Sequence, residues 1–355
     1  MLVMVLNPYS NLPKSAFWKS GVAKENPFAI ENIYKRKFKI DSHSKIATAG
    51  SCFAQHITRH LKKNGYTVLD VEPPPPGLPE NLHQMFGFSM YSARYGNIYT
   101  VRQLLQLAQE AAGEWIPYNY IWEKDQKFYD ALRPAVEPDG LGTPEEVLQQ
   151  REIHIKRVKK LFMELDLFIF TLGLTEMWVH KESGTVYPTA PGTLIGEFDE
   201  DIYEFKNAQF AEIIKDFNLF RRVVEKNIRG GRPFKCLLTV SPVPLTASAS
   251  GKHVLVSTSY SKSNLRCVAG QLSMNHQSID YFPSYEIVMN PRMHSTAFSD
   301  NLRTVRNETV EVVMRHFFDQ HPIIEQNKQR FLHAKSQSKA IDDLQCEEAL
   351  IEVFS

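Results

Sequence analysis

The stretch Ala49-Gly50-Ser51-Cys52-Phe53-Ala54 joins an apolar run to an amphipathic segment, and it decides how the first part of the chain folds. The apolar residues from Lys45 up to the glycine predict a short buried strand. Phe53, Ile57 and Leu61 then recur at i, i+4 and i+8, which predicts a helix that begins at or just after the serine. The stretch is therefore a turn from a strand into a helix.

Ser51 stands at this turn, and two interpretations of it are open. A serine at such a turn lies close to unbonded backbone N–H groups and to the positive end of the helix, which together can stabilise an oxyanion. Serine is also a favoured helix N-cap, so a purely structural role is the alternative. Cys52 follows directly, and a helix N-terminus lowers the pKa of a thiol. Its structural alternative is packing in the core.

The composition limits the classes of partner. The chain has 355 residues with 41 basic and 40 acidic side chains, a net charge of +1. No field of one sign favours nucleic acid or an anionic membrane. The four cysteines contain no C-x-x-C pair, which suits a reducing compartment and indicates neither disulfides nor a zinc site. The start does not resemble a signal peptide, and the longest later apolar run, 167–174, is too short to span a membrane. We expect a soluble cytoplasmic protein of open oligomeric state, with no nucleic-acid or membrane partner.

Predicted strands and helices alternate from Lys45 onward. Thr143-Pro144-Glu145-Glu146 combines an N-cap, a proline at the first helical position and a capping-box glutamate. The unbroken apolarity of 167–173 and 236–242 is typical of strands buried on both faces of a parallel sheet. The other predicted elements are a strand at 66–71, a helix between Thr100 and Gly113, helices at 210–224 and 262–276, a strand at 284–289, and a last helix after Asp300.

This alternation predicts an α/β fold, a three-layer αβα sandwich with a central parallel sheet. Ligands of such sheets lie beyond the carboxyl ends of the strands. The segments that follow strands should therefore share one edge; they are Ser51, 173–176, 241–244 and 290–300. The expected organisation is an N-terminal extension at 1–40, a domain at 41–320 that contains an insertion at 114–142, and a polar tail at 321–355.

Gly50-Ser51-Cys52-Phe53-Ala54 resembles the signature of the GSCFA family, which is similar to the SGNH or GDSL-type hydrolases. The resemblance covers roughly residues 41–320, and further agreeing segments are 95–99, 171–178, 241–245, 260–262 and 281–288. It implies a three-layer fold with a serine nucleophile after the first strand. The implied function is that of an esterase or O-acyltransferase acting on an acyl ester of a carbohydrate or similar hydroxyl-bearing substrate.

The resemblance also implies roles for particular residues. Ser51 would be the nucleophile, and the oxyanion hole would combine its N–H with Gly96, Asn97 beside it, and Thr175. SGNH enzymes have Gly-x-Asn-Asp where this chain has Gly173-Leu174-Thr175-Glu176. A threonine hydroxyl can donate to an oxyanion, but it is shorter than an asparagine amide. The glutamate would bind the Ser51 loop or, alternatively, satisfy local backbone N–H groups.

The sharpest departure from SGNH hydrolases lies near the end of the domain. Those enzymes have Asp-x-x-His, and this chain has Asp300-Asn301-Leu302-Arg303. Arginine cannot accept a proton near neutral pH, so Arg303 is not a general base. Asp300 is either the residue that orients a base or the N-cap of the last helix. His294, six residues before Asp300, and His253, after the 241–245 turn, are the candidate bases, because an imidazole titrates near neutral pH.

A second hypothesis follows from the missing histidine: a non-catalytic pocket that binds an anionic or carbohydrate ligand, with Arg303 making a bidentate contact. Arg292, Arg306 and Lys262 could add to a basic pocket mouth, although solvated helix faces explain them equally well. His56 and His60 share a helix face, but no carboxylate completes a metal motif. No phosphate-binding loop or dinucleotide fingerprint is present, so we expect neither a metal nor another cofactor.

Overall fold

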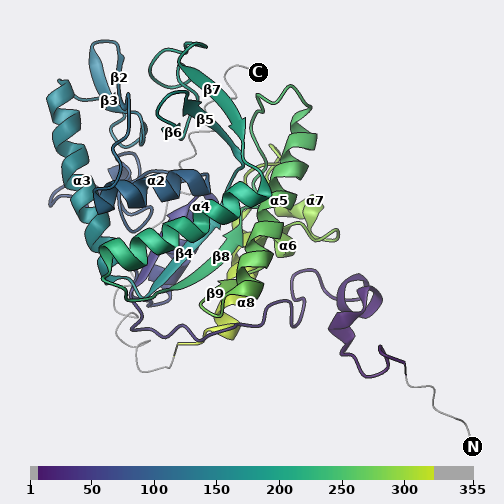
Figure 1. Cartoon of the computed structure of the whole chain (residues 1–355). Coiled ribbons are helices and arrows are strands. Elements are labelled where there is room, and N and C mark those ends of the chain that lie inside the picture. Colours follow the sequence, from purple (N-terminus) through teal and green to yellow (C-terminus); the bar gives the residue numbers. More distant parts are fainter. Residues whose placement is uncertain (1–6, 324–355) are drawn as a thin grey trace, which may run out of the picture.

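A four-stranded parallel sheet lies at the centre of the computed structural model, which describes residues 7–323 (Figure 1). Its strands run in the order β1 (Ile46–Gly50), β4 (Leu167–Leu172), β8 (Lys235–Val240) and β9 (Ile279–Tyr281). Gly50 pairs with Thr171, and Thr171 pairs with Thr239. Because all four strands are parallel, their carboxyl ends lie at one edge of the sheet.

Helices cover both faces of this sheet, which confirms the predicted three-layer αβα fold. One face packs against α2 (Val101–Ala112), α3 (Pro144–Glu164), α4 (Phe210–Arg222) and α5 (Val254–Asn275). The other packs against α1 (Phe53–Lys63), α6 (Ser284–Val288), α7 (His294–Ala297) and α8 (Asn307–Gln320). Successive residues of β4 alternate between the two cores, because side chains of a strand point alternately to opposite faces.

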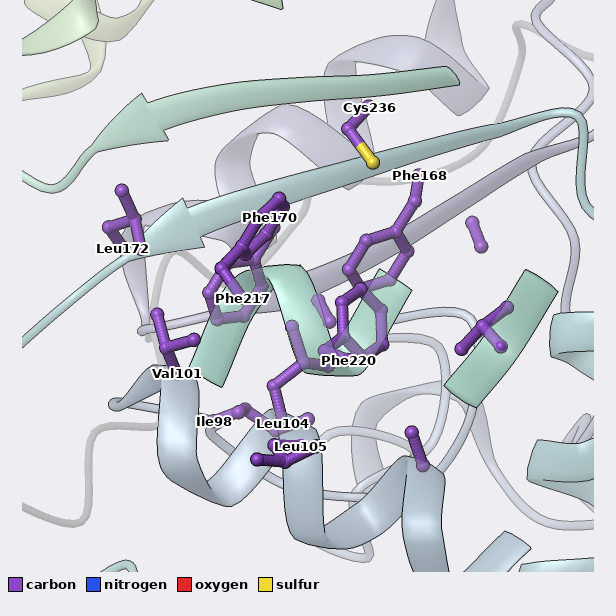
Figure 2. Close-up of a cluster of buried hydrophobic side chains, with 14 of the residues drawn as sticks. Ile98, Val101, Leu104, Leu105, Phe168, Phe170, Leu172, Phe217, Phe220 and Cys236 are labelled. Atoms are coloured by element: carbon purple, nitrogen blue, oxygen red, sulfur yellow. The ribbon is translucent and has the colours of Figure 1, made fainter. Parts of the chain in front are cut away.

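The first core is rich in aromatic side chains. Figure 2 shows Phe168 and Phe170 of β4 pointing toward Phe217 and Phe220 of α4, and the rings of Phe168 and Phe220 lie 5.5 Å apart. Burial raises the pKa of the Cys236 thiol in β8 to about 12, so this cysteine is an inert packing residue. Ring packing of this kind holds α4 on the sheet.

The helix signals in the sequence are confirmed where capping residues carry them. Thr100 accepts the N–H of Gln103 at 3.3 Å, and the Gln103 side chain accepts the N–H of Thr100 at 2.9 Å. Gly113 then closes α2 with a left-handed φ of 80°. Thr143 and Glu146 form the same reciprocal pair at the start of α3.

Two predicted elements are wrong in type or extent. The strand at 66–71 reduces to one bridge between Val68 and Ile46, because the Val71 N–H donates to Ser92 instead of continuing a ladder. The strand at 284–289 is the helix α6, and the sheet strand precedes it as β9. The Ser284 hydroxyl donates to Val240 O at 3.1 Å, which fixes α6 at the end of β8.

The starts of the last two long helices also differ from the prediction. Helix α5 begins at Val254, eight residues before position 262, because His253 caps it. Helix α8 begins at Asn307 with Arg306 at its N-cap, so Asp300 is not an N-cap. The chain turns at Leu302, which has a φ of +53° and is exposed.

Two small antiparallel sheets were not foreseen. The insertion at 114–142 contains the hairpin of β2 (Ile121–Lys124) and β3 (Lys127–Asp130). A three-stranded sheet has the order β6 (Val186–Tyr187), β5 (Glu176–His180) and β7 (Tyr203–Asn207). The two sheets share a core of Trp122, Tyr187 and Tyr203. The remaining short helical segments are Lys14–Ala16, Lys19–Ala23, Glu80–Leu82 and Val223–Ile228.

Within residues 7–40, the later part of the N-terminal extension packs into the core of the domain. Tyr34 and Ile40 are buried in the second core, whereas the short helices at Lys14–Ala16 and Lys19–Ala23 bury no residue and extend away from the body (Figure 1). The predicted tail lies outside the described residues apart from its first three. No helix within residues 7–323 combines the length and apolarity that a membrane crossing needs.

A buried ionic cluster ties the insertion to α3. Arg151 donates two hydrogen bonds to the Asp130 carboxylate, at 3.0 and 2.9 Å, and Arg133 donates a third at 2.7 Å. Burial alone would raise the pKa of Asp130, but the two guanidinium groups lower it to about 2. Nearby, the buried His154 lies 2.8 Å from the Glu72 carboxylate.

Stability should fall as the pH drops below neutrality, in part because of His154. Burial and the neighbouring Arg133 lower the pKa of His154 to about 4 from its ordinary value of 6.5. Between pH 6.5 and about pH 4, His154 binds a proton in the unfolded chain but not in the folded chain. We therefore expect His154 to remove about 2 kcal/mol of unfolding free energy between pH 7 and pH 5. Urea unfolding at both pH values measures the loss. His154→Gln should show a smaller loss, and the exposed His43→Gln should match the wild type.

Gly50→Ala should destabilise the fold by about 3 kcal/mol, from backbone strain and overpacking together. A Cβ at position 50 would lie 2.5 Å from Thr171 O, and the residue has a φ of +141°. Gly113→Ala is the matched control, since its φ is also positive but open space surrounds it. It should cost about 1 kcal/mol. If urea unfolding gives equal losses of unfolding free energy for the two variants, the contact with Thr171 does not contribute to the destabilisation.

Candidate functional site

Ser51 lies between β1 and α1 at the carboxyl edge of the sheet, with 3% of its surface exposed. Its N–H donates to Thr171 O at 3.3 Å, and its carbonyl lies 3.1 Å from the Tyr91 hydroxyl. The Oγ is buried and has no hydrogen-bond partner within the described part of the chain. The backbone of Ser51 is thus fully engaged while its hydroxyl is not.

The serine side chain is not a helix cap. The first N–H groups of α1 are satisfied by backbone: Ala54 donates to Ser51 O at 2.8 Å and Gln55 donates to Cys52 O at 3.1 Å. The structural alternative for Ser51 is therefore wrong. A buried hydroxyl without a partner costs roughly 1–3 kcal/mol of desolvation, so its presence calls for an explanation other than stability.

The loop at 95–98 lies directly beside Ser51. The Ile98 N–H donates to Gly50 O at 2.9 Å, and Gly96 takes a left-handed φ of 66°. Asn97 is buried, and its Oδ1 lies 2.5 Å from the Tyr91 hydroxyl and 3.4 Å from the Gln55 amide. These contacts fix the amide of Asn97, and the hydrogen bond from Ile98 to Gly50 holds the loop that carries Gly96 and Asn97 beside the Ser51 turn.

The turn after β4 packs against Ser51 from the other side. A Cβ at Gly173 would lie 3.0 Å from the Ser51 Cβ, so only glycine fits without displacement. Tyr99 O accepts the N–H groups of Gly173 and Leu174, which fixes the turn. Thr175 is fully buried, and its Oγ1 has no hydrogen-bond partner among residues 7–323. A second unpaired hydroxyl thus lies two residues from the glycine that contacts Ser51.

Lys262 is the residue that sequence reasoning placed wrongly. The sequence left Lys262 either at the basic mouth of a pocket or on a solvated helix face, but the residue is 1% exposed. Its Nζ donates to Gly173 O at 2.7 Å, and the neighbouring Ser261 hydroxyl accepts the Thr175 N–H at 3.1 Å. The sequence analysis missed this burial because α5 begins earlier than predicted. The earlier start places Lys262 in the third turn of the helix, against the edge of the sheet.

Glu176 turns away from the Ser51 loop. Its half-buried carboxylate accepts the Ser248 hydroxyl at 2.8 Å. Burial raises the pKa of this carboxyl, and the hydrogen bond from Ser248 offsets part of that effect. Neither expected role fits, because its partner is a side chain of the 246–250 loop.

The structure does not assemble the predicted His–Asp pair. His253 is exposed and caps α5 by accepting the Leu255 N–H at 3.1 Å. His294 is exposed at the start of α7, with its ring 5.6 Å from that of Phe298. The Asp300 carboxylate is fully exposed and lies 3.6 Å from Arg306. Because Ser51 Oγ has no partner among residues 7–323, neither imidazole is hydrogen-bonded to it.

The arginines near this edge bind backbone carbonyls. Arg303 is half-buried and donates to Pro244 O at 3.3 Å, which brings it to the loop after β8. Arg292 donates to Ala23 O and Glu25 O in the N-terminal extension, at 2.8 and 2.7 Å. Arg306 donates to Phe298 O at 2.7 Å. Of these three arginines, only Arg303 is hydrogen-bonded to the loop after β8.

A cavity of about 40 Å³ lies behind Asn97, lined also by Arg151 and His154. It has room for water but not for an acyl ester, so it is not a substrate site. Within residues 7–323, no three His, Cys, Asp or Glu side chains gather closely enough to hold a metal ion.

Comparison with known proteins gives one match. The family model described as the GSCFA family matches residues 45–317, from just before β1 into α8. Searches of curated proteins and of solved structures found no match. The match covers well over half of the chain and contains Ser51, Gly96, Gly173, Thr175 and Lys262. The chain belongs to the GSCFA family.

Proposed function

We propose that this protein is a serine acyl-transfer enzyme similar to the SGNH hydrolases, an esterase or O-acyltransferase. The observation that carries the proposal is the buried, unpaired hydroxyl of Ser51 at the N-terminus of α1. A nucleophile of this kind follows a strand, so that neighbouring donors can stabilise the charge of an acyl intermediate. The proposed substrate is an acyl ester of a carbohydrate or similar hydroxyl-bearing molecule, on the basis of the family resemblance.

The surroundings of Ser51 suggest which groups would stabilise the oxyanion. The Ser51 N–H donates to Thr171 O, so it is already engaged. The proposed donors are instead the N–H of Gly96, the amide of Asn97 and the Thr175 hydroxyl, which has no partner among residues 7–323. Because Ser51 is 3% exposed, the substrate must displace loops at the sheet edge before the reaction.

The proposal includes a reducing, cytoplasmic location. Within residues 7–323, Cys52, Cys236 and Cys267 form no disulfide, which is typical of proteins in that compartment. The net charge of +1 provides no field of one sign that would favour nucleic acid or an anionic membrane as a partner.

One observation favours a second candidate, a pocket that binds an anionic or carbohydrate ligand without reaction. Arg303 stands at the position where the Asp-x-x-His motif has its histidine. The Arg303 guanidinium donates to Pro244 O in the loop after β8. In this alternative Arg303 would hold a carboxylate or phosphate by paired hydrogen bonds.

Ser51→Ala should abolish hydrolysis of p-nitrophenyl acetate and labelling by a fluorophosphonate, with a loss of about three or more orders of magnitude. Its thermal unfolding temperature should stay unchanged or rise, because the removed hydroxyl makes no hydrogen bond. Exposed Ser295→Ala is the control and should behave like the wild type. A wild type in which mass spectrometry detects no adduct on Ser51 across pH 6–9 would refute the proposal.

Arg303→His separates the two candidate functions. If the protein is already an esterase, this variant should change p-nitrophenyl acetate hydrolysis by less than about tenfold, since Ser51 already has a proton acceptor. If the wild type is inactive and the variant gains activity that Ser51→Ala then removes, the site is a binding pocket that lacks a base. The measurement is the hydrolysis rate of wild type, single variants and double variant.

A further inference from the structure

The site contains a serine without the histidine that usually activates it, and it contains a buried amine, Lys262 Nζ, that donates to Gly173 O beside that serine. We propose that Lys262 accepts the proton of Ser51, forming a serine–lysine pair in place of the histidine-dependent arrangement. This inference rests on the proposed acyl-transfer function and adds the identity of its base. Serine–lysine pairs are a known variant of the triad logic in other folds.

The burial of Lys262 sets it apart from the other candidate bases. Lysine is almost never fully buried, yet Lys262 is 1% exposed. Burial disfavours the charged form of an amine, and a neutral amine is the form that can accept a proton. His253 and His294 are exposed and hydrogen-bonded or packed elsewhere, and Arg303 cannot lose its proton.

Gly173 connects the amine to the serine. Lys262 Nζ donates to Gly173 O at 2.7 Å, and a Cβ on the same glycine would lie 3.0 Å from the Ser51 Cβ. Both side chains therefore adjoin one residue at the carboxyl edge of the sheet. The two reacting atoms are not yet hydrogen-bonded, so transfer requires a rotation of Ser51 or Lys262 toward the other.

The local backbone holds this arrangement in place. Ser261 accepts the Thr175 N–H while Lys262 binds Gly173 O, so consecutive residues of α5 clamp both ends of the turn after β4. The same turn carries the Thr175 hydroxyl, a proposed oxyanion donor. One short segment thus positions the acceptor of the proton and a donor to the developing charge.

The proposed reaction balances without any further reactant. The neutral Nζ takes the Ser51 proton as Oγ bonds to the carbonyl carbon, and the C=O electron pair moves to the carbonyl oxygen. Collapse of this oxyanion breaks the ester C–O bond, and the resulting ammonium gives its proton to the leaving alcohol. Water or an acceptor hydroxyl then repeats the sequence on the acyl-enzyme and regenerates both side chains.

A purely structural role for Lys262 makes a different prediction, and substitutions distinguish the two. Lys262→Gln keeps a donor for Gly173 O without a base, and Lys262→Met removes both. For a proton acceptor, both variants should lose about 100-fold or more in the rate of fluorophosphonate labelling at Ser51. The exposed Lys252→Met is the matched control and should label at the wild-type rate. Circular dichroism and thermal unfolding check that each variant is folded.

The pH dependence gives a second, independent readout. The labelling rate of the wild type should rise with pH to a plateau, and the inflection should be absent from Lys262→Met and Lys262→Gln. The inference is overturned if Lys262→Gln labels within threefold of the wild type, or if the inflection persists without the lysine. Should these variants fail to fold, Lys262→Arg takes their place, because arginine keeps a donor for Gly173 O but cannot lose its proton, and labelling within threefold of the wild type would overturn the inference equally. A wild type that never labels at Ser51 refutes the acyl-transfer function itself, which is a distinguishable result.

Discussion

The close approach of β1 to β4 at their carboxyl ends is the constraint on which the site depends. A Cβ at Gly50 would lie 2.5 Å from Thr171 O, so no side chain fits between the strands, and a Cβ at Gly173 would lie 3.0 Å from the Ser51 Cβ. Two glycines therefore bring the start of α1 and the turn after β4 into direct contact. Any larger residue at either position would separate the serine from the groups that surround it.

The site combines groups that cost stability. The hydroxyls of Ser51 and Thr175 have no partner within the described residues, and Lys262 is a buried amine. Two apolar cores, one on each face of the sheet, offset this cost. Features of this kind are commonly found where a protein retains reactivity rather than maximal stability.

The insertion and the antiparallel sheets show where local sequence patterns lose their predictive value. The N-cap Thr100 and the capping box at Thr143 predicted α2 and α3 correctly, because both partners of each capping hydrogen bond lie within four residues. The segment 284–289 reads as a strand by its apolarity, but the Ser284 hydroxyl bonds to Val240 across the fold and the segment becomes α6. Hairpins such as β2–β3 bury aromatic residues against distant partners, so their pattern is not periodic.

The sequence by itself determined the αβα architecture, the family and the candidate role of Ser51, since these follow from hydrophobic periodicity and from one contiguous motif. It also indicated that Arg303 cannot be the base. Only the tertiary structure decided that Ser51 caps no helix, that His253, His294 and Asp300 are exposed, and that Lys262 is buried beside Gly173. The burial of Lys262 depends on contacts between residues far apart in the chain, such as Lys262 and Gly173, which are 89 positions apart. Burial at such contacts is set by packing rather than by neighbouring residues in the chain.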